Sequence, residues 1–432
     1  MSGDPLAFLL SLERLGMKFG LENISRLCQA LAHPERAFDS VVVAGTNGKG
    51  SVTAMVHAGL RAAGHHAARY TSPHLVRLEE RFVVGDDEVS REALTRAAGR
   101  VQHIVERLMD DGTFESPPTF FECTTAAAFE LFRAAGVRVA VLEVGLGGRL
   151  DATNVASPLV AAITSIDFDH QAQLGDSLES IAREKAGIAR PGIPLVCGPL
   201  PAAAERVVAR VCAATGATLV RTSDRVACTV QHLGPESMVT LRSAERRLDG
   251  VRLALPGRHQ VDNAATAFVV LEELNGRGYV VDSEAIRAGL STARWPARLE
   301  RFRYGHAEVL LDAAHNPAGA RALAQYLRDV GWTPVTIVFG AMRDKDAAGM
   351  LQALLPACRR LICTTAPAPR ALEADALARV AAGLAPHPAI EAISAPRAAL
   401  ERACAQDSRI VAAGSIFLVG PLRVILRPDA HS

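Results

Sequence analysis

The segment that decides the fold is SVVVAGTNGKGS, residues 40–51. It opens with a β-branched run, passes through a turn with three glycines and one lysine, and leads into a stretch typical of a helix up to Ala63. A short β-branched run before a glycine-rich turn predicts a buried strand of a parallel sheet, followed by the helix that covers it.

Further apolar runs extend this pattern along the chain. Val137–Val144 (VRVAVLEV) and Pro158–Ser165 (PLVAAITS) are continuous apolar segments, and the alanine-rich segment Thr124–Ala135 is typical of a helix. Continuous apolar runs suit strands that are covered by helices on both faces. We therefore expect an α/β fold whose first domain has a mostly parallel central sheet.

A change in the pattern of apolar residues and a second strand–helix series indicate two domains, as the length of 432 residues also predicts. Ala217–Glu245 holds short alternating segments, typical of small antiparallel strands. From Glu308 onward, helix-like segments alternate with the apolar runs VLLDAA, VTIVFG, LICTTA and RIVAAGS, which predict a smaller, Rossmann-like α/β domain. We place the boundary at Trp295–Pro296, and in Ala366–Ala403 we expect helices and loops. The predicted domains are residues 1–295 and 296–432.

Composition excludes several classes of partner. Lys and Arg number 47 and Asp and Glu 46, so no net field would attract nucleic acid or an anionic membrane. The start carries no basic segment ahead of an apolar stretch, and no apolar run reaches membrane-spanning length. The eight cysteines are scattered without a CxxC pair, which predicts buried reduced thiols and argues against zinc. We expect a cytoplasmic protein.

The glycine turn has the chemistry of a phosphate-binding loop. Gly48 and Gly50 let backbone N–H groups turn toward an anion, the helix N-terminus adds positive potential, and Lys49 supplies a mobile cation. Ser51 can offer a hydroxyl to a phosphate or to magnesium. The spacing departs from G-x-x-x-x-G-K-[ST], because Gly50 separates the lysine from the serine. The competing interpretation is an ordinary glycine-rich turn, which a lysine flanked by glycines disfavours.

Polar side chains stand close to the ends of the predicted strands. Glu143 ends the run VRVAVLEV, His170 follows the run PLVAAITS, and Ser72 lies in the turn YTSPHL. Because α/β folds place ligand groups at the carboxyl ends of parallel strands, these residues can reach phosphates held by Lys49, through magnesium. Each has a competing structural role. Glu143 can cap a turn or pair with Arg149, His170 can be a hydrogen-bonded loop histidine, and Ser72 can cap a turn. A nitrogen ligand is unusual for magnesium.

The second domain offers a comparable turn. Asp312 and His315 follow its first apolar run, and Asn316–Pro317 has the form of a helix start. Both are candidates for a site that faces the first domain, although Asp312 has a competing role as a helix cap. Arg298 can meet an anion across the cleft or form a surface salt bridge. Lys185 lies on a predicted helix, where a lysine is ordinarily a solvated charge.

The order of these motifs resembles the folylpolyglutamate synthase and dihydrofolate synthase family of the Mur ligase superfamily. The matching segments, from residue 20 to residue 420, are GLENISRL, AGTNGKGS, YTSPHL, FECTTAAAF, EVGLGGRLDATN, ITSIDFDH, EKAGI, PGRHQVDNAATA, WPARLE, LLDAAHNPAGA, VFGAMRDKD and GSIFLVG. The resemblance implies an N-terminal P-loop ATPase domain and a C-terminal glutamate-ligase domain. The chain departs from it where many relatives read ITNIGLDH, since Asp167 stands here, and where QAQLG replaces a threonine-containing run after His170.

The resemblance also implies roles for particular residues, with Lys49, Lys185 and His315 as the catalytic ones. ATP would be bound by Thr46, Asn47, Gly48, Lys49, Gly50, Ser51, Asn263, Arg298 and Asp312. Two magnesium ions would be held by Ser72, Glu143, His170 and Lys185, the last as a carbamate whose carboxylate can bind metal. His315 and Ser415 would lie near the incoming glutamate. The pterin pocket would include Thr119, Phe120, Phe121, Glu122, Leu150, Asp151 and Ala152.

The implied reaction couples a folate carboxylate to the amine of L-glutamate. ATP would convert the carboxylate into an acyl phosphate, Lys49 and magnesium would offset the charge on the transferred phosphoryl group, and His315 is a candidate base for the amine. The acid is dihydropteroate, a reduced folate that already carries glutamate, or both, and we favour a bifunctional monomer. Phe120 and Phe121 suit stacking on a pterin, although adjacent aromatics more often belong to a core.

Three alternatives stay open. The enzyme can be a monofunctional folylpolyglutamate synthase. A cell-wall Mur peptide ligase would share the ATP loop but carries a nucleotide-sugar domain ahead of it, and the 44 residues before Gly45 are too few for one. A non-ligating ATPase module would hydrolyse ATP without glutamate and a folate, and would leave the DAAHNP turn of the second domain without a role.

Overall fold

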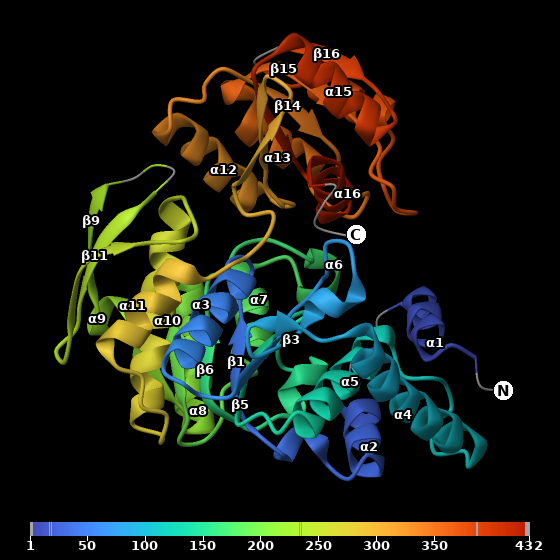
Figure 1. Ribbon diagram of the computed structural model, residues 1–432, viewed down its shortest axis with the longest axis vertical. Coiled ribbons are helices and arrows are strands. Elements are labelled where there is room, and N and C mark those ends of the chain that lie inside the picture. Colours follow the sequence, from blue (N-terminus) through green and yellow to red (C-terminus); the bar gives the residue numbers. More distant parts are fainter. Residues whose placement is uncertain are drawn as a thin grey trace.

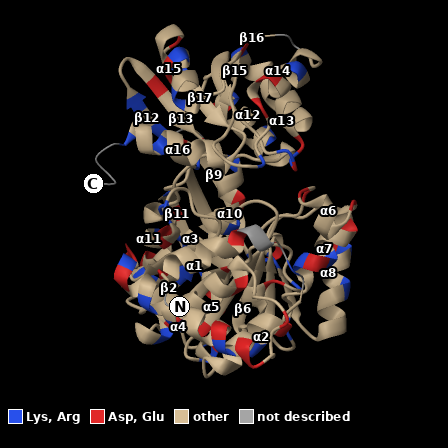
Figure 2. Ribbon diagram, turned by 90° about the vertical axis from the view of Figure 1, so that its right-hand side faces the viewer, with Lys and Arg blue, Asp and Glu red and all other residues tan. Residues whose placement is uncertain are grey.

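The computed structural model describes residues 3–427 except 17, 19, 233, 235, 386 and 387. Its elements form two α/β units, which lie one above the other in Figure 1 and are joined by residues 293–299. Basic and acidic residues are mixed over both units in Figure 2, in keeping with their nearly equal numbers. None of the helices in the described part of the chain combines the length and the apolar character needed to cross a bilayer.

The first unit is built on an eight-stranded sheet. Its strands are β1 Asp39–Ala44, β2 Ala67–Tyr70, β3 Phe82–Val84, β4 Asp87–Glu88, β5 Val139–Glu143, β6 Pro158–Ile163, β7 Pro194–Cys197 and β8 Thr218–Arg221. They lie in the order β4-β3-β2-β5-β1-β6-β7-β8, and the pairs that β3 forms with β2 and β4 at one edge are the antiparallel ones. The expectation of a mostly parallel sheet is confirmed.

Helices cover both faces of this sheet, which explains the continuous apolar runs. Val41 and Val43 of β1 pack with α3, α10 and α11, whereas Val42 and Ala44 face the core formed with α2, α4, α5, α7 and α8. The helices of this unit are α1 Pro5–Ser11, α2 Glu22–Ala30, α3 Lys49–Ala62, α4 Arg91–Asp110, α5 Phe120–Ala134, α6 Gln171–Leu174, α7 Leu178–Ala186, α8 Ala202–Thr215, α9 Thr222–Arg225, α10 Arg258–Asn275 and α11 Ser283–Thr292. Short 3-10 turns are η1 Leu12–Leu15, η2 Pro34–Arg36, η3 Leu78–Arg81 and η4 Ala152–Val155.

A small three-stranded sheet projects from the first unit (Figure 1). It consists of β9 Ala227–His232, β10 Met238–Arg242 and β11 Arg247–Arg252, and its pairs are antiparallel. The antiparallel prediction for Ala217–Glu245 is therefore right for most of that segment. It is wrong for β8, at the start of the segment, which instead adds to the large sheet as a parallel edge strand.

The second unit is a six-stranded sheet with helices around it. Its strands are β12 Glu300–Tyr304, β13 Ala307–Leu311, β14 Val335–Phe339, β15 Cys358–Cys363, β16 Ala389–Ala392 and β17 Arg409–Ala413, in the order β12-β13-β17-β14-β15-β16, parallel except for β12. Its helices are α12 Pro317–Asp329, α13 Ala347–Leu354, α14 Ala374–Ala382, α15 Pro396–Gln406 and α16 Ile416–Leu426, with the turn η5 Leu355–Ala357. The expectation of helices and loops alone in Ala366–Ala403 is wrong, because β16 pairs there with β15. The division at residues 295 and 296 stays a proposal.

The helix that begins at the phosphate loop is held by a close helix crossing. A Cβ on Gly289 of α11 would lie 2.6 Å from the Gly59 nitrogen and 2.9 Å from the Met55 oxygen of α3. Both contacts are to backbone atoms, which cannot move aside as a side chain can. Glycine at residue 289 therefore sets how closely α11 supports α3.

We expect Gly289→Ala to lower the free energy of unfolding by about 1–3 kcal/mol, because the added methyl group overpacks the crossing. Urea unfolding measures the change. Gly276→Ala is the matched control, since Gly276 has φ −67° and a Cβ there meets nothing closer than 3.8 Å. Equal stability of Gly289→Ala and the wild type would contradict the close crossing.

Candidate active site

Loops at the carboxyl ends of the two parallel sheets face each other, as ligand-binding loops of α/β proteins do. Asn47, after β1, and Asn316, after β13, exchange two hydrogen bonds of 3.0 and 3.3 Å between their side chains. The facing loops of the first unit are residues 45–48, 71–77, 144–151 and 164–170. Those of the second unit are residues 312–316, 340–346 and 414–415.

The phosphate loop is a glycine turn that is hydrogen-bonded to Ser165, after β6. Gly45 and Gly48 have φ values of 149° and 87°, which other residues rarely adopt. The Thr46 N–H donates to the carbonyl of Ser165 (2.8 Å), and the Asn47 N–H donates to its hydroxyl (3.0 Å). Lys49 folds back over the loop and donates to the carbonyl oxygens of Gly45 (3.1 Å) and Thr46 (3.2 Å).

A second lysine reaches the same loop from α7. Lys185 is buried, with 4% of its surface exposed, and its amine donates to the carbonyl of Gly45 at 2.9 Å. Burial, aided by the positive charge of Lys49, lowers the pKa of the Lys185 amine to about 7. Reading Lys185 as a solvated helix charge is therefore wrong.

Two further titratable groups border the phosphate loop. Burial raises the pKa of Glu143 to about 6, against the charge of Lys49 and the N–H of Ser72, which donates to the carboxylate at 3.3 Å. Burial lowers the pKa of His170 to about 4, and Lys49 contributes to that shift, so the imidazole is neutral at pH 7. Ser72 thus contacts Glu143, and the charge of Lys49 acts on both Glu143 and His170. Arg149 pairs instead with Glu184 (2.9 Å), which removes it as the partner of Glu143.

Asp169 is the centre of a polar junction between the units. Its carboxylate accepts from Lys345 (2.5 Å) and from the amide of Asn316 (3.0 Å), and lies 3.5 Å from Nε2 of His315. Burial favours the neutral acid, but the hydrogen bond from His315 and the charge of Lys345 outweigh it and hold the pKa of Asp169 far below its usual range. Lys345 also lies 3.3 Å from Nε2 of His170.

Asp167, at which this chain departs from the related motif, also forms contacts between the two units. Its carboxylate accepts from Arg321 of α12 at 2.9 Å. Its backbone N–H donates to the hydroxyl of Thr46, which in turn donates to the backbone carbonyl of Asp167. The Asp167 side chain therefore pairs with the second unit.

The segment that joins the units has a strained backbone around Arg298. Ala297 and Leu299 have φ values of 56° and 52°, which cost energy for residues with a side chain. Glu300 accepts from the N–H of Ala297 (2.9 Å), and buried Asp312 accepts from the N–H of Leu299 (3.0 Å). Burial raises the pKa of Asp312, and the charge of Arg298 opposes it. The competing role of Asp312 as a helix cap is wrong, because Asn316 caps α12; Asp312 instead holds the turn that contains Arg298.

His315 has both ring nitrogens close to oxygen acceptors. Nδ1 lies 2.9 Å from the carbonyl of Ala313, and Nε2 faces Asp169. In this arrangement neither nitrogen faces open space from which a substrate amine could approach it. A role as base therefore requires the contact with Asp169 to open.

The predicted pterin residues have clear local roles in the fold. Thr119 and Glu122 form a reciprocal cap at the start of α5. Asp151 caps η4 and accepts from the N–H of Leu146 (2.9 Å), while Ala152 is buried beside it. Phe120 and Phe121 are partly exposed at the edge of the core, where Arg81 lies 5.0 Å from the Phe120 ring centroid. Leu150 is also partly exposed.

Ser415 lies at the start of α16, and Asn263 lies within α10 against the phosphate loop. Ser415 is buried and caps α16 by accepting from the N–H of Phe417 at 3.2 Å. A Cβ on Gly48 would lie 2.3 Å from the Asn263 oxygen, so Asn263 packs directly on the phosphate loop. Next to it, Gln260 donates to the hydroxyl of Ser51 at 3.2 Å.

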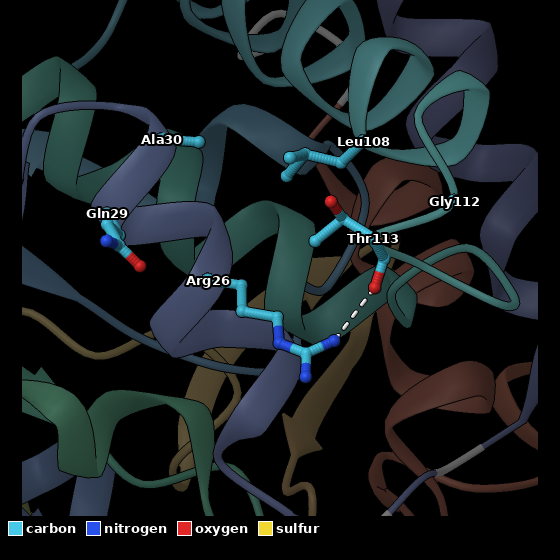
Figure 3. Close-up of a pocket in the computed structure, with 6 residues that line it drawn as sticks. All are labelled: Arg26, Gln29, Ala30, Leu108, Gly112 and Thr113. Atoms are coloured by element: carbon cyan, nitrogen blue, oxygen red, sulfur yellow. Dashed lines mark hydrogen bonds between the residues drawn. The ribbon is translucent and has the colours of Figure 1, made fainter.

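A shallow depression elsewhere shares no residue with this site. Figure 3 shows it between α2 and the end of α4, with Arg26 donating to the carbonyl of Thr113 at 2.8 Å. Its lining residues are Arg26, Gln29, Ala30, Leu108, Gly112 and Thr113. The candidate site is instead defined by the facing loops.

Sequence reasoning gave no role to Asp169 and Lys345; it predicted Asn316 only as the helix start that it forms at α12, and not its contact with Asp169. Asp169 carries the same signal as His170, a polar residue after a buried strand, and Lys345 follows β14 in the same way. The rule on strand ends would have found both. Their mutual pairing has no local signal, because 176 residues separate Asp169 from Lys345.

Comparison with known proteins gives the class. The Mur ligase middle domain matches residues 43–271, and the Mur ligase glutamate ligase domain matches residues 297–416. A curated dihydrofolate synthase/folylpolyglutamate synthase of Bacillus subtilis is 36% identical over 79% of this chain and 80% of its own length. The chain spans half the length of a probable bifunctional folylpolyglutamate synthase/dihydropteroate synthase of Haloferax volcanii, at 36% identity over 97% of this chain.

Solved structures agree with these matches. Escherichia coli FolC in complex with DHPP and ADP has a TM-score of 0.88 and 30% identity, covering 99% of both chains. A bifunctional folylpolyglutamate synthase/dihydrofolate synthase with Mn, AMPPNP and L-glutamate bound has a TM-score of 0.83 and 34% identity, covering 99% of this chain and 98% of that one. The chain belongs to the folylpolyglutamate synthase/dihydrofolate synthase family of the Mur ligases.

Lys185 should make stability depend on pH when no ligand is bound. Its pKa is near 10.5 in the unfolded chain and about 7 in the folded one. The unfolded chain therefore binds more protons between these values, and the free energy of unfolding falls as the pH is lowered through this window. Because one pH unit between the two pKa values corresponds to about 1.4 kcal/mol, the fall should reach a few kcal/mol.

Urea unfolding from about pH 7 to about pH 10, in buffer without metal or bicarbonate, measures this dependence. Lys185→Met is the comparison, since it keeps the length of the side chain and loses the titrating group. We expect the variant to gain stability over the wild type toward pH 7. Parallel pH profiles of the two proteins would contradict a buried amine with a lowered pKa.

Proposed function

We propose that the protein is an ATP-dependent ligase that joins the carboxylate of a folate to the amine of L-glutamate. The observation that carries the proposal is that the half-buried amine of Lys49 and the buried amine of Lys185 meet on one carbonyl of a glycine loop at a helix N-terminus. Buried cations need a compensating anion, and such a loop is where α/β proteins bind phosphates. The ADP and AMPPNP of the similar structures support ATP as the source of that anion.

Residues from both units would bind the nucleotide. The N–H groups of residues 46–51 and the amine of Lys49 would take the phosphates. Asn263 packs on Gly48 and is positioned to contact the nucleotide beside the loop. Arg298, whose guanidinium donates to the carbonyl of Ala297 at 3.0 Å, would bring a second positive charge from the linker. Asp312 would act chiefly by holding that turn.

The donor groups fit a divalent metal that is shared with phosphate. Across the described ranges no three His, Cys, Asp or Glu side chains are arranged to hold a metal by themselves. Ser72, Glu143 and neutral His170 would therefore need phosphate oxygens to complete the coordination of magnesium, which prefers oxygen. The Mn in a similar structure supports a divalent ion. Bound metal would supply charge stabilisation at the transferring phosphoryl group.

Lys185 would hold a second ion after reacting with carbon dioxide. With a pKa of about 7, a large share of its amine is neutral and nucleophilic at pH 7. Its nitrogen would add to the carbon of carbon dioxide and release one proton, which gives a carbamate anion. This modification turns a buried cation beside Lys49 into a buried anion. The charge conflict between the two lysines then becomes an attraction.

The chemistry has two displacements. A carboxylate oxygen of the folate would attack the γ-phosphorus of ATP, and ADP would leave, stabilised by Lys49. The amine of glutamate would then attack the carbonyl carbon of the acyl phosphate, lose its proton, and expel phosphate. His315 and Ser415 lie on the second unit, which would bring glutamate to the acyl phosphate and exclude water.

We infer that both dihydropteroate and reduced folates are accepted. The relative from Bacillus subtilis carries both activities in its name, and DHPP is bound in one similar structure. Phe120 and Phe121, partly exposed above the Thr119–Glu122 cap, would provide the aromatic wall for a pterin. The monomeric state and the cytoplasmic location stay predictions.

The direct test is a ligation assay with MgATP, L-glutamate, and either dihydropteroate or tetrahydrofolate. We expect each acid to give a glutamylated product together with one phosphate per amide bond, because the acyl phosphate forms once per ligation. Mass spectrometry identifies the product, and phosphate release gives the rate. Phosphate release without a product from either acid would support the ATPase module instead. A product from tetrahydrofolate alone would indicate a monofunctional enzyme.

The carbamate proposal predicts that activity depends on bicarbonate. Enzyme kept in buffer free of carbon dioxide should lose most of its activity and regain it on addition of bicarbonate, since the second metal site depends on the carbamate carboxylate. With ¹³C-labelled bicarbonate, NMR should show a carbamate carbon in the wild type and none in Lys185→Gln. Full activity without carbon dioxide, or in Lys185→Ala, would contradict the proposal.

A further inference from the structure

One of the two tryptophans of the chain touches the phosphate-loop helix from the linker. Trp295 lies between α11 and the turn that holds Arg298. A Cβ on Gly50 would lie 2.2–2.8 Å from three atoms of the Trp295 ring. The indole therefore rests against the backbone of Gly50, directly after Lys49. No larger residue at position 50 would leave room for the ring.

A buried arginine approaches the same ring from the sheet. Arg69 of β2 places its guanidinium carbon 5.6 Å from the centroid of the Trp295 ring, within the range of a cation–π contact. Its Nε is buried and has no hydrogen-bond partner in the part of the chain that the structure describes. Burial lowers the pKa of Arg69 to about 10, so the group is still charged at pH 7. The charges of Glu88 and Glu143 also act on Arg69, and the indole ring is its aromatic contact.

Trp295 is also the start of the strained segment that presents Arg298. Pro296 follows it, and Ala297 and Leu299 are fixed by hydrogen bonds to Glu300 and Asp312. The path from Gly50 through Trp295 to Arg298 is therefore short and has few free torsions. A shift of the first turn of α3 would be passed to the linker by direct contact.

We propose that Trp295 is a positioning residue that couples the phosphate loop to Arg298 and to the second unit. Arg69 holds the indole against Gly50, and the indole fixes where the linker starts. Phosphates bound at Lys49 would order the first turn of α3 and, through this contact, the linker. The inference rests on the proposed binding of ATP at this loop, and goes beyond it by assigning the residue that connects the loop to the linker.

Tryptophan fluorescence tests the coupling directly. Trp332→Phe leaves Trp295 alone, and Trp295→Phe leaves Trp332, which lies in the second unit against Arg301 and Arg409. We expect MgATP to change the emission of Trp332→Phe in step with the binding heat measured by calorimetry. The emission of Trp295→Phe should not change. Should Trp332→Phe fail to fold, the difference between the wild type and Trp295→Phe reports the same signal.

The outcomes separate the inference from the proposed function. Binding heat without a change in Trp295 emission would overturn the coupling and leave the nucleotide site intact. Absence of binding heat in the wild type would overturn the proposed function, and the coupling with it. Arg69→Met should shift the emission of Trp295 before any nucleotide is added, because it removes the charge beside the ring.

Steady-state kinetics for ATP provide a second test, because a residue with a purely structural role would leave kcat/KM unchanged in a folded variant. Trp295→Ala should lower kcat/KM for ATP by about ten- to a hundredfold, as misplacement of a site by a remote change can. Trp295→Phe should recover most of that loss, because its ring still contacts Gly50. Thermal unfolding confirms that the variants are folded. Unchanged kcat/KM in a folded Trp295→Ala would overturn the inference.

Discussion

Two ammonium groups meeting at one carbonyl oxygen are the constraint on which this structure depends. Lys49 and Lys185 both donate to Gly45; Lys185 is buried, whereas Lys49 is partly exposed. Burying one ammonium group beside another is costly unless an anion compensates the two charges or one group loses its proton. The lowered pKa of Lys185 is the second of these responses, and a phosphate or a carbamate would supply the first. The loop is thus built for ligands that carry negative charge.

The remaining architecture serves this loop. Parallel strands place Glu143 and His170 at the same edge as the glycine turn, and the close α3–α11 crossing fixes the helix that begins at Lys49. A second parallel sheet directs its own carboxyl ends toward the first, where Asp169 collects partners from both units. Asp169, Lys345, His315 and Asn316 each lie close to another polar group of this junction. An anionic ligand that pairs with one of them can therefore change the partners of the others.

Sequence patterns predicted the features that depend on neighbouring residues in the chain. The run Ser40–Ala44, the glycine turn and the following helix appear as expected, since their signals lie within a dozen residues. The strand β16, with the sequence AIEA, was missed because it is short and half-exposed at a sheet edge, without an apolar run. The burial of Lys185 could not be read from its helix, since the packing of α7 against the phosphate loop decides it. The pairing of Asp169 with Lys345 likewise depends on how the two units meet.

The measurement that tests the central claim most directly is the affinity for MgATP of the wild type and of Lys49→Met, by calorimetry at pH 7. If the Lys49 amine compensates phosphate charge, its loss should weaken binding by about 1.5–3 kcal/mol, the worth of a hydrogen bond to a charged group. Lys18→Met, a lysine outside the site, should bind as the wild type does. Equal affinity in Lys49→Met and the wild type would contradict the account, because the positive loop would then have no part in holding the nucleotide.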